Sequence, residues 1–436
     1  MRHPGRMALR GNAPRGRVPC TCVPAPRHPA LATAALILGG VAIGTTEFVT
    51  MGLLPRIADG VQVSIPVAGH TISAYAAGVV SGAPLIAALG ATRPRKGLLL
   101  SLMAAFAVGN VLSALAPSYE LLVAARFLSG LPHGAFFGVA ALVAVDLAPN
   151  GRAGRAVGTV MLGIPIANVL GVPGATWLGQ HAGWRSAYWL VAVLGAATVA
   201  LVALGVPRLA ADPTRTVRAE LSALKSLQVM LTLAVAAIGF GGMFAMYSYI
   251  APTVTEVTGL SESAVPVFLL VFGAAGFVGN LVAGRMGDWS VLRSVVIGMV
   301  GLGVGLALFA LAAPYAVAAL VVLALVSMLA SVLVINLQLR LMQVAGAAQT
   351  LAAAGNHAAL NAANALGAWL GGVVIAAGYA YTAPSWVGVG LAVLGLGVLA
   401  LSVRLHRRDT RGSRADRPGS RRAVAQALSR SSSSVG

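Results

Sequence analysis

The sequence predicts an all-helical integral membrane protein, because it is rich in apolar residues, poor in charge and contains long stretches without any charged residue. Of its 436 residues, 58% are hydrophobic and 9% are charged, whereas charged residues make up about 25% of a typical soluble domain. Stretches such as 97–119, 156–184 and 226–255 are free of charge. Each can hold the roughly 20 apolar residues that cross a bilayer as a helix. The composition therefore excludes a water-soluble fold.

Helices explain this composition better than the strands of a membrane barrel. Glycine, proline and alanine occur throughout the apolar stretches, while a barrel would alternate apolar and polar residues in segments of about 10 residues. We predict twelve transmembrane helices, at 31–55, 68–91, 97–116, 118–147, 155–180, 184–206, 228–253, 263–287, 294–313, 316–343, 351–378 and 384–404.

The basic residues are distributed unequally between the two sides of this predicted bundle. A net charge of +19 would suggest a nucleic-acid partner in a soluble protein. Here, however, most arginines and lysines fall in the two tails and in the connections that follow the second, fourth, sixth, eighth and tenth predicted spans. These segments all lie on one side of the bundle, and the connections on the other side carry only Arg56 and Arg185. By the positive-inside rule we expect both termini to be cytoplasmic. The basic side is then expected to contact anionic lipid, and we expect no nucleic-acid partner.

The chain divides into two halves joined by a polar segment. We expect residues 207–227, the longest internal polar segment, to link a six-helix bundle at 31–206 to a second one at 228–404. A shift of 197 residues aligns Pro55 with Pro252 and Gly82 with Gly279, which supports an internal duplication. Residues 1–30 and 405–436 are basic and read as disordered tails. Cys20 and Cys22 lie in the first tail and are expected to be free thiols.

Several short motifs lie on the predicted spans. The first span contains Gly44-Thr45-Thr46-Glu47-Phe48, and the fourth contains Arg126-Phe127-Leu128-Ser129-Gly130. The fifth carries Gly163 and then Gly171-Val172-Pro173-Gly174, and Trp184-Arg185 opens the sixth. With these motifs, residues 31–404 resemble the major facilitator superfamily, and within it the twelve-span drug:proton antiporters of the bacterial sugar-efflux-like and chloramphenicol-efflux-like branch.

The loop signature of that family, Gly-x-Leu-Ala-Asp-Arg-x-Gly-Arg-Lys, is incomplete in both halves. Gly284-Arg285-Met286-Gly287-Asp288 matches its front in the C-terminal half. In the N-terminal half Arg95-Lys96 matches its end, and Ala91 stands where the acid would fall. The resemblance implies a latch on the cytoplasmic side, formed by Asp288, Arg285, Arg93, Arg95 and Lys96.

Two charged residues, Glu47 and Arg126, lie well inside predicted spans. A charge at the bilayer centre costs about 2.5–3.5 kcal/mol, so both are expected to face the protein interior and to have a function. Desolvation favours the neutral form of a carboxyl and a nearby cation favours its charged form, which suits Glu47 to exchange a proton. His133 lies seven residues after Arg126, on the same helical face, and could share that proton. Helix packing is the alternative for all three residues, above all for His133, which follows Pro132.

Two further sets of residues are candidates for roles in transport. Gly163, Gly171, Pro173 and Gly174 are expected to bend the fifth span and to allow close packing. By resemblance this helix would seal against the eighth span, in which Gly273, Gly276, Gly279 and Gly284 would meet it. Polar and aromatic residues of the C-terminal spans could line a substrate cavity or, alternatively, join helices to one another: Tyr247, Asn280, Asn336, Asn361 and Asn364, and also Tyr249, Gln338, Asn356, His357 and Trp369.

The sequence lacks a GxxxxGK[ST] phosphate loop, an HExxH motif and any cluster with metal-ligand spacing. We therefore expect a gradient-driven carrier without cofactor or metal, and not an enzyme. The resemblance implies a major facilitator fold of two six-helix bundles around a central cavity, exporting a small organic solute in exchange for protons and working as a monomer. Uptake symport or facilitated diffusion on the same fold is the first alternative, and a membrane-embedded enzyme or receptor is the second. The excess of arginine over lysine suggests a GC-rich bacterial genome. We expect the protein to lie in the inner membrane of a bacterium.

Overall fold

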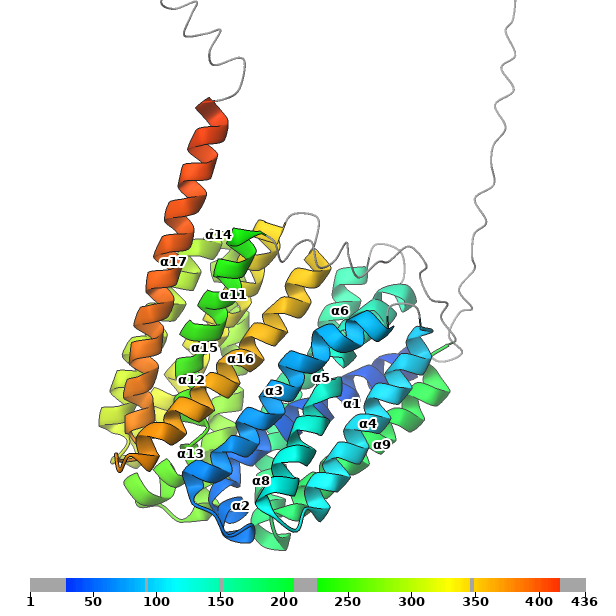
Figure 1. The fold of residues 1–436 in the computed structure, drawn as a ribbon, viewed down its shortest axis with the longest axis vertical. Helices are drawn as coiled ribbons and strands as arrows, with labels where there is room; N and C mark the ends of the chain where they lie inside the picture. Colours follow the sequence, from blue (N-terminus) through cyan, green and yellow to red (C-terminus); the bar gives the residue numbers. More distant parts are fainter. Residues whose placement is uncertain (1–28, 91–92, 149–151, 208–225, 346–348, 416–436) are drawn as a thin grey trace, which may run out of the picture.

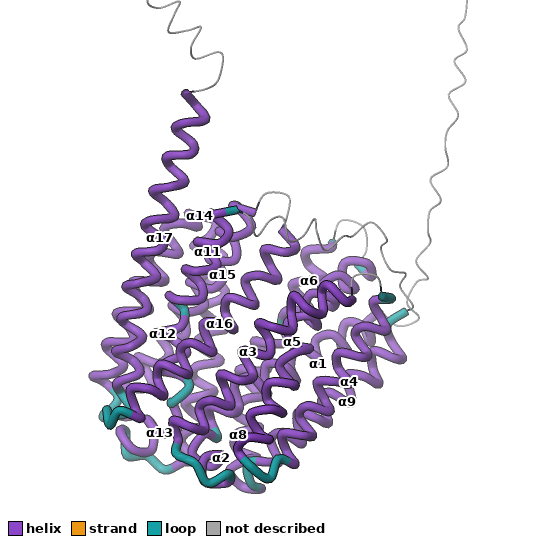
Figure 2. The backbone as a smooth tube through the Cα atoms, in the orientation of Figure 1, coloured by secondary structure: helices purple, strands orange, loops and turns teal. Residues whose placement is uncertain are grey.

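The computed structural model describes residues 29–90, 93–148, 152–207, 226–345 and 349–415. Most of the two predicted tails and of the predicted linker, together with Cys20, Cys22 and Ala91, lie outside these ranges. Within them every regular element is a helix, as Figure 2 shows. A helix satisfies its backbone hydrogen bonds internally, which is what the bilayer interior demands.

The N-terminal half consists of six crossings with two interruptions. Its elements are α1 (Pro29–Gly52), the short α2 (Leu54–Gly60), α3 (Ile65–Gly90), α4 (Arg95–Leu115), α5 (Tyr119–Leu147), α6 (Ala153–Met161), α7 (Gly163–Ile166), the π-helical η1 (Ala167–Gly171), α8 (Val172–Ala182) and α9 (Arg185–Gly205). The elements α6, α7, η1 and α8 follow one another without a loop and form the fifth crossing.

The C-terminal half begins with a broken crossing and continues with long helices. Its elements are α11 (Leu227–Gly239), α12 (Gly241–Tyr247), α13 (Ile250–Pro252), the π-helical η3 (Thr253–Val257), the 3₁₀-helical η4 (Glu262–Ala264), α14 (Val265–Ala312), α15 (Ala316–Ala345), α16 (Gln349–Ala376) and α17 (Ala383–Ala415). The last helix continues past residue 404, where the predicted twelfth span ends.

The 48-residue helix α14 contains two crossings, because the chain reverses direction at Ser290. A straight helix of that length would measure about 72 Å, more than twice the thickness of a bilayer core. Ser290 has non-helical backbone angles, φ −171° and ψ 108°. The first arm runs parallel to α15, since Ser327, Ser331 and Asn336 donate in turn to the carbonyls of Phe272, Gly276 and Ala283. The second arm runs antiparallel to it, since Gly305, Gly301 and Gly298 lie against Val326, Leu329 and Leu333.

In the part of the chain that the structure describes, this division gives twelve membrane crossings. Ten helical segments are long and apolar enough to span a bilayer, and α3 passes the same test together with α2, from which it is bent by 107°. One of the ten, Glu262–Ala312, is the segment that Ser290 divides. The predicted all-helical fold is confirmed, and the crossings follow the predicted order.

The two halves lie side by side, with α1 to α9 in one and α11 to α17 in the other (Figure 1). They meet along α3 and α16, where Ser73 Oγ donates to Ala365 O over 3.1 Å, and along η1 and α14. Because the number of crossings is even, α1 begins and α17 ends on one side of the molecule, which we call the terminal side. The opposite side, near α2 and α13, is called the far side (Figure 1).

Glycines allow α5 to lie directly against α3, and this contact positions the candidate site. A Cβ atom added at Gly130 would lie 2.2 Å from the Tyr75 carbonyl oxygen, and one added at Gly78 would lie 2.2 Å from the Phe127 carbonyl oxygen. Helices in lipid associate largely through such close packing, because lipid tails are as apolar as the side chains. The close approach brings Tyr75 of α3 to the functional face of α5.

Candidate functional site

Arg126 is completely buried and is bonded to the first crossing. Its two terminal nitrogens donate to Thr46, Nη1 to the hydroxyl over 3.0 Å and Nη2 to the backbone carbonyl over 3.1 Å. The guanidinium carbon lies 4.3 Å from the ring centroid of Tyr75 and 5.4 Å from that of Tyr188. Aromatic faces stabilise a cation that has lost its water. The Nε atom has no hydrogen-bond partner among the described residues, so the two bonds to Thr46 leave part of the donor capacity of Arg126 unused.

Thr46 is fixed in turn by Asn110 of α4. The Thr46 hydroxyl donates to Asn110 Oδ1 over 2.6 Å, and Asn110 Nδ2 donates to the Phe106 carbonyl over 2.9 Å. Asn110 is completely buried and was not among the predicted site residues. The signal that could have identified it is a single amide side chain in the otherwise apolar third crossing, which is expected to find a partner there.

Glu47 follows Thr46 directly and lies at the boundary between the halves, with 6% of its surface exposed. Its carboxyl is next to the side-chain amide of Asn364 on α16. Both polar atoms of that amide are buried without a full hydrogen bond. Arg126 is held near Glu47 through Thr46, the residue that precedes Glu47 in α1. Within the described ranges, however, the ion pairs are Arg56 with Glu262 and Arg95 with Asp146, so Glu47 and Arg126 do not form one.

His133 lies further along the same face of α5 and shares a partner with Arg126. The Tyr75 hydroxyl is hydrogen-bonded to His133 Nδ1 over 3.1 Å, while His133 Nε2 is buried without a partner. The imidazole meets Phe137 edge-on at 5.5 Å between centroids, and Phe137 is stacked on His357 of α16 at 5.5 Å. His133 is therefore connected to Arg126 through Tyr75, and the hydrogen bonds of the described residues do not join it to Glu47.

Tyr247 lies in an aromatic cluster that crosses between the halves. Its ring is stacked on Phe272 with 4.1 Å between centroids and meets Phe48 of α1 edge-on at 6.1 Å. Phe48 also lies parallel to Phe244 at 6.3 Å. Phe48 follows Glu47 in α1, so this aromatic cluster adjoins the segment of the helix that carries the carboxyl.

The asparagines proposed for the cavity have different surroundings. Asn336 donates to the Ala283 carbonyl over 3.2 Å and so joins α15 to α14. Asn361 donates to a carbonyl four residues earlier in its own helix, over 3.1 Å. Asn280 is half-buried. The helix-packing alternative thus fits Asn336 and Asn361, and Asn364 is the asparagine of this set that lies beside Glu47.

The latch expected from the loop signature is not formed between the halves in the described residues. Arg95 forms an ion pair with Asp146 of α5, and Lys96 Nζ donates to the Ala203 carbonyl of α9 over 2.6 Å, so both tie helices of the N-terminal half together. Arg285, Asp288 and Arg93 are exposed. Arg285 donates to the Leu281 carbonyl of its own helix, over 3.5 Å. The reason is local, because Asp146 offers Arg95 a carboxylate within its own half.

The glycines of the fifth crossing also divide into two groups. Gly163 and Gly171 lie against α1, where added Cβ atoms would come within 2.7 Å of Gly40 Cα and within 2.1 Å of Thr45 Oγ1. Pro173 is buried, but a Cβ atom at Gly174 would meet nothing within 4 Å, so that residue is not needed for close packing.

The fifth crossing meets the eighth at one glycine of the four that we expected there. A Cβ atom at Gly273 would lie 2.2 Å from the Asn168 carbonyl oxygen of η1. Gly276 and Gly279 instead face residues of α15, and Gly284 has no atom within 4 Å of an added Cβ. The expected contact of the fifth and eighth crossings is therefore present, but it is narrower than the sequence suggested.

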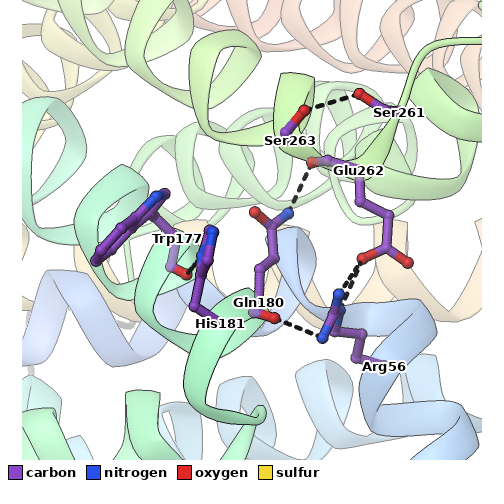
Figure 3. A network of polar contacts seen from close by, with 7 residues as sticks. All are labelled: Arg56, Trp177, Gln180, His181, Ser261, Glu262 and Ser263. Carbon is purple, nitrogen blue, oxygen red and sulfur yellow. Dashed lines mark hydrogen bonds and ion pairs between the residues drawn. The ribbon is translucent and has the colours of Figure 1, made fainter.

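A polar network on the far side connects the two halves (Figure 3). Arg56 of α2 donates to Glu262 Oε2 of η4 through Nε, over 2.7 Å, and to the Gln180 carbonyl of α8 through Nη1, over 2.6 Å. Gln180 Nε2 donates to the Glu262 carbonyl over 2.8 Å. The three residues form a closed set of contacts that holds the halves together on this side. The sequence signal for it was the scarcity of basic residues on the far side, where Arg56 and Glu262 lie in connections of different halves.

The comparisons with known proteins agree with this architecture. The model of the Major Facilitator Superfamily matches residues 36–356. The chain is 40% identical over 374 residues to the inner membrane transport protein YdhP of Escherichia coli K12, which covers 85% of this chain and 95% of YdhP. It is 34% identical over 385 residues to the putative transporter AraJ of Escherichia coli K12, covering 88% of this chain and 97% of AraJ.

Two further similarities concern a resistance protein and a solved structure. The chain is 37% identical over 330 residues to a chloramphenicol resistance protein of Streptomyces lividans, covering 75% of this chain and 84% of that protein. The crystal structure of a D-xylose-proton symporter has a TM-score of 0.66 to this chain at 18% sequence identity, covering 84% of this chain and 96% of that one. Because the sequence identity is only 18%, this similarity establishes a shared fold and not a shared substrate or mechanism.

Proposed function

Because the chain belongs to the major facilitator superfamily and is thus a membrane transporter, we propose that it exports a small organic solute in exchange for protons. The observation that carries the proposal is the placement of Glu47. Among the described residues this buried carboxyl at the boundary of the halves forms no ion pair, and it lies beside the Asn364 amide, whose two polar atoms make no hydrogen bond of normal geometry there. An unpaired buried polar group costs about 1–3 kcal/mol, so such groups favour a ligand or a proton that satisfies them.

In this proposal Glu47 exchanges the proton while the two halves rock about the site. Its carboxylate can accept a hydrogen bond from Asn364 Nδ2, and its protonated form can donate one to Asn364 Oδ1, so the contact between the halves depends on the proton. A polar group of the solute would replace Asn364, and Phe48 and Tyr247 would contact its apolar part. Arg126 favours the charged form of Glu47, and His133 is a second group that can hold a proton.

Export in place of uptake is supported by the similarity to the chloramphenicol resistance protein. The proton-coupling residues themselves do not set the direction, and an uptake symporter would use the same groups. Counterflow of a candidate solute with and without an imposed pH gradient separates the two mechanisms. An antiporter accumulates solute in inverted vesicles when the interior is acidic, and a symporter loses it.

We further propose that the terminal side is cytoplasmic and that the membrane is a bacterial inner membrane. Arg95, Lys96 and Arg285 lie on the terminal side, while Arg56 and Arg185 lie at far-side ends of helices. Lys and Arg in short connections favour the cytoplasmic side of the membrane. YdhP, named as an inner membrane protein, supports this location. The far-side network would then face the periplasm.

Glu47→Gln tests the proposed function. This substitution keeps the size and hydrogen-bonding capacity of the side chain but removes its ability to release a proton. We expect solute export driven by a pH gradient in inverted vesicles to be lost, while the protein is still inserted in the membrane in normal amount. Glu120→Gln is the matched control, because Glu120 is an exposed carboxylate in the first turn of α5. Retention of full proton coupling by Glu47→Gln would overturn the assignment.

A further inference from the structure

Arg126 uses both terminal nitrogens on the residue that precedes Glu47, and not on Glu47 itself. A guanidinium and a carboxylate near one another in a region without water normally form a direct, often bidentate pair. Here the Thr46 hydroxyl and carbonyl occupy Nη1 and Nη2 instead. This arrangement keeps the charge of Arg126 close to Glu47 without direct contact.

The orientation of the Thr46 hydroxyl is determined by its neighbours. Asn110 Nδ2 donates to the Phe106 carbonyl, so the other atom of the amide, Oδ1, faces Thr46 as an acceptor. The single hydroxyl proton of Thr46 is therefore directed to Asn110, over 2.6 Å. A lone pair of the hydroxyl then faces Arg126, which donates to it over 3.0 Å. Each residue in this series therefore donates to the next: Arg126 to Thr46, Thr46 to Asn110, and Asn110 to the Phe106 carbonyl.

We propose that Thr46 and Asn110 are positioning residues that keep Arg126 from forming an ion pair with Glu47, so that Glu47 can take up and release its proton. This inference rests on the proposed role of Glu47 in proton exchange, but its structural part can be tested separately. Thr46 holds the guanidinium, and Asn110 holds the Thr46 hydroxyl in the accepting orientation. Neither residue needs to contact the solute or the proton.

The contacts of the other ionisable groups in this region are to residues other than Glu47. On α3 the Tyr75 hydroxyl is bonded to His133 of α5, and on α9 the Tyr188 hydroxyl is bonded to Thr50 over 2.9 Å. In the C-terminal half the rings that approach this region are Tyr247 of α12 and His357 of α16, which stack on phenylalanines. Arg126 is thus the group whose movement would change the charge state of Glu47 most directly.

Thr46→Val is the informative substitution, because valine has the shape of threonine without the hydroxyl. It leaves Nη1 as well as Nε of Arg126 without a partner, and Glu47 is then the nearest available acid. An ion pair favours the charged carboxylate, so the pH at which Glu47 is half protonated should fall by about 1 unit or more. Thr46→Ser should restore the parent value, and Asn110→Leu should lower it by a smaller amount.

Dicyclohexylcarbodiimide reacts with a protonated carboxyl, so the pH dependence of its reaction with Glu47 reports how far Glu47 is protonated. The extent of modification is measured by mass spectrometry of the purified full-length protein. The Glu47→Gln variant supplies the blank. Thr198→Val is the matched control, because Thr198 is also completely buried but donates to a carbonyl of its own helix, Leu194 O, over 2.8 Å. The pH profile of transport is recorded with the same variants.

The outcomes separate the two proposals. A lower midpoint in both the modification and the transport profiles of Thr46→Val supports both. A lower midpoint of modification with an unchanged transport profile supports the positioning role and contradicts the role of Glu47 in coupling. An unchanged modification midpoint overturns the positioning role. If Thr46→Val does not insert in the membrane, Asn110→Leu takes its place. A lower modification midpoint of Asn110→Leu then supports the positioning role, and an unchanged midpoint overturns it.

Discussion

Arg126 shows how a full positive charge is retained where no water solvates it. Two hydrogen bonds to Thr46 and the faces of Tyr75 and Tyr188 replace the hydration shell. Hydrogen bonds to a charged group contribute about 1.5–3 kcal/mol each, and a cation over a desolvated ring gains about 2 kcal/mol. The planar guanidinium can make these contacts together, whereas the ammonium of lysine is a compact point charge.

Arg126→Lys should therefore reduce transport although the charge is kept. A lysine cannot bond both oxygens of Thr46 and stack on Tyr75 in the same way, so at least one charge-assisted hydrogen bond is lost. We expect the transport rate to fall about tenfold or more, since about 1.4 kcal/mol corresponds to a factor of ten. Arg155→Lys, at an exposed arginine of α6 to which no role is assigned, is the control and should transport like the parent. Equal rates for the two variants would contradict the role of the guanidinium geometry.

At the same scale, the sequence predicted the charged residues of the site but not their partners. Glu47 and Arg126 could be identified because a charged side chain inside an apolar span is energetically costly and usually has a function. Asn110 could not be ranked above Asn336 or Asn361, since the partner of an amide depends on helix packing, which a single sequence does not reveal. In the structure Asn110 bonds to Thr46, while Asn336 and Asn361 bond to backbone carbonyls.

At the scale of elements, the contact between η1 and α14 is determined by backbone atoms. Gly273 of α14 lies directly against the Asn168 carbonyl, at the π-helical turn of the fifth crossing. A π-helical turn leaves its carbonyls in irregular positions and often marks a functional segment. Any side chain at position 273 would have to displace backbone, which is more costly than moving a flexible side chain.

Gly273→Ala should therefore destabilise the protein and slow transport. The new methyl carbon would lie 2.2 Å from a backbone oxygen, so one helix must shift. Overpacking of this kind costs about 1–3 kcal/mol. We expect a lower melting temperature in detergent, measured by fluorescence-detected gel filtration. Gly174→Ala, where the added carbon meets nothing within 4 Å, is the control and should melt like the parent. A stable, fully active Gly273→Ala variant would show that the contact is not tight.

The order and the number of elements followed from hydropathy, but their interruptions did not. The break between α1 and α2 and the reversal within α14 depend on backbone angles at single residues such as Ser290. The fifth crossing was predicted to bend at its glycines and Pro173, yet Gly174 has no packing role. Glycine allows close approach wherever it occurs, and only the tertiary structure shows which glycines are used.

At the scale of the whole molecule, the far-side network is a weak link between the halves. The side chains of Arg56 and Glu262 are 39% and 47% exposed, so their ion pair is screened by solvent. An exposed pair of this kind contributes about 0–1 kcal/mol. That is enough to bias a balance between two states of a carrier without locking it, because a change of about 1 kcal/mol shifts the ratio of the states about fivefold.

Reversing one of these charges should favour separation of the halves on the far side. Arg56→Glu or Glu262→Arg places like charges together, and we expect the separated population to rise about two- to fivefold. The double variant should partly reverse this effect, because the bond of Arg56 to Gln180 is not restored. Distances between spin labels on cysteines at His181 and Tyr379 measure the population, after replacement of Cys20 and Cys22.

Arg185→Glu is the control for this experiment. Arg185 is the other far-side arginine of the N-terminal half, and its Nη2 atom donates to the Ala116 carbonyl of the same half, over 2.9 Å. The control should leave the distance distribution unchanged. If Arg56→Glu and Arg185→Glu give the same distribution, the network does not hold the halves together.

The reversal of α14 at Ser290 also bears on protein engineering. The Ser294 hydroxyl contacts the Met286 and Ser290 carbonyls, at 2.7 and 2.8 Å. These contacts join the two arms of α14 directly at the turn. We therefore expect the eighth and ninth crossings to enter the membrane and to move as one hairpin. An affinity tag, a reporter domain or a split point placed at this turn would separate two arms that share their packing partner α15, and such insertions belong elsewhere in the chain.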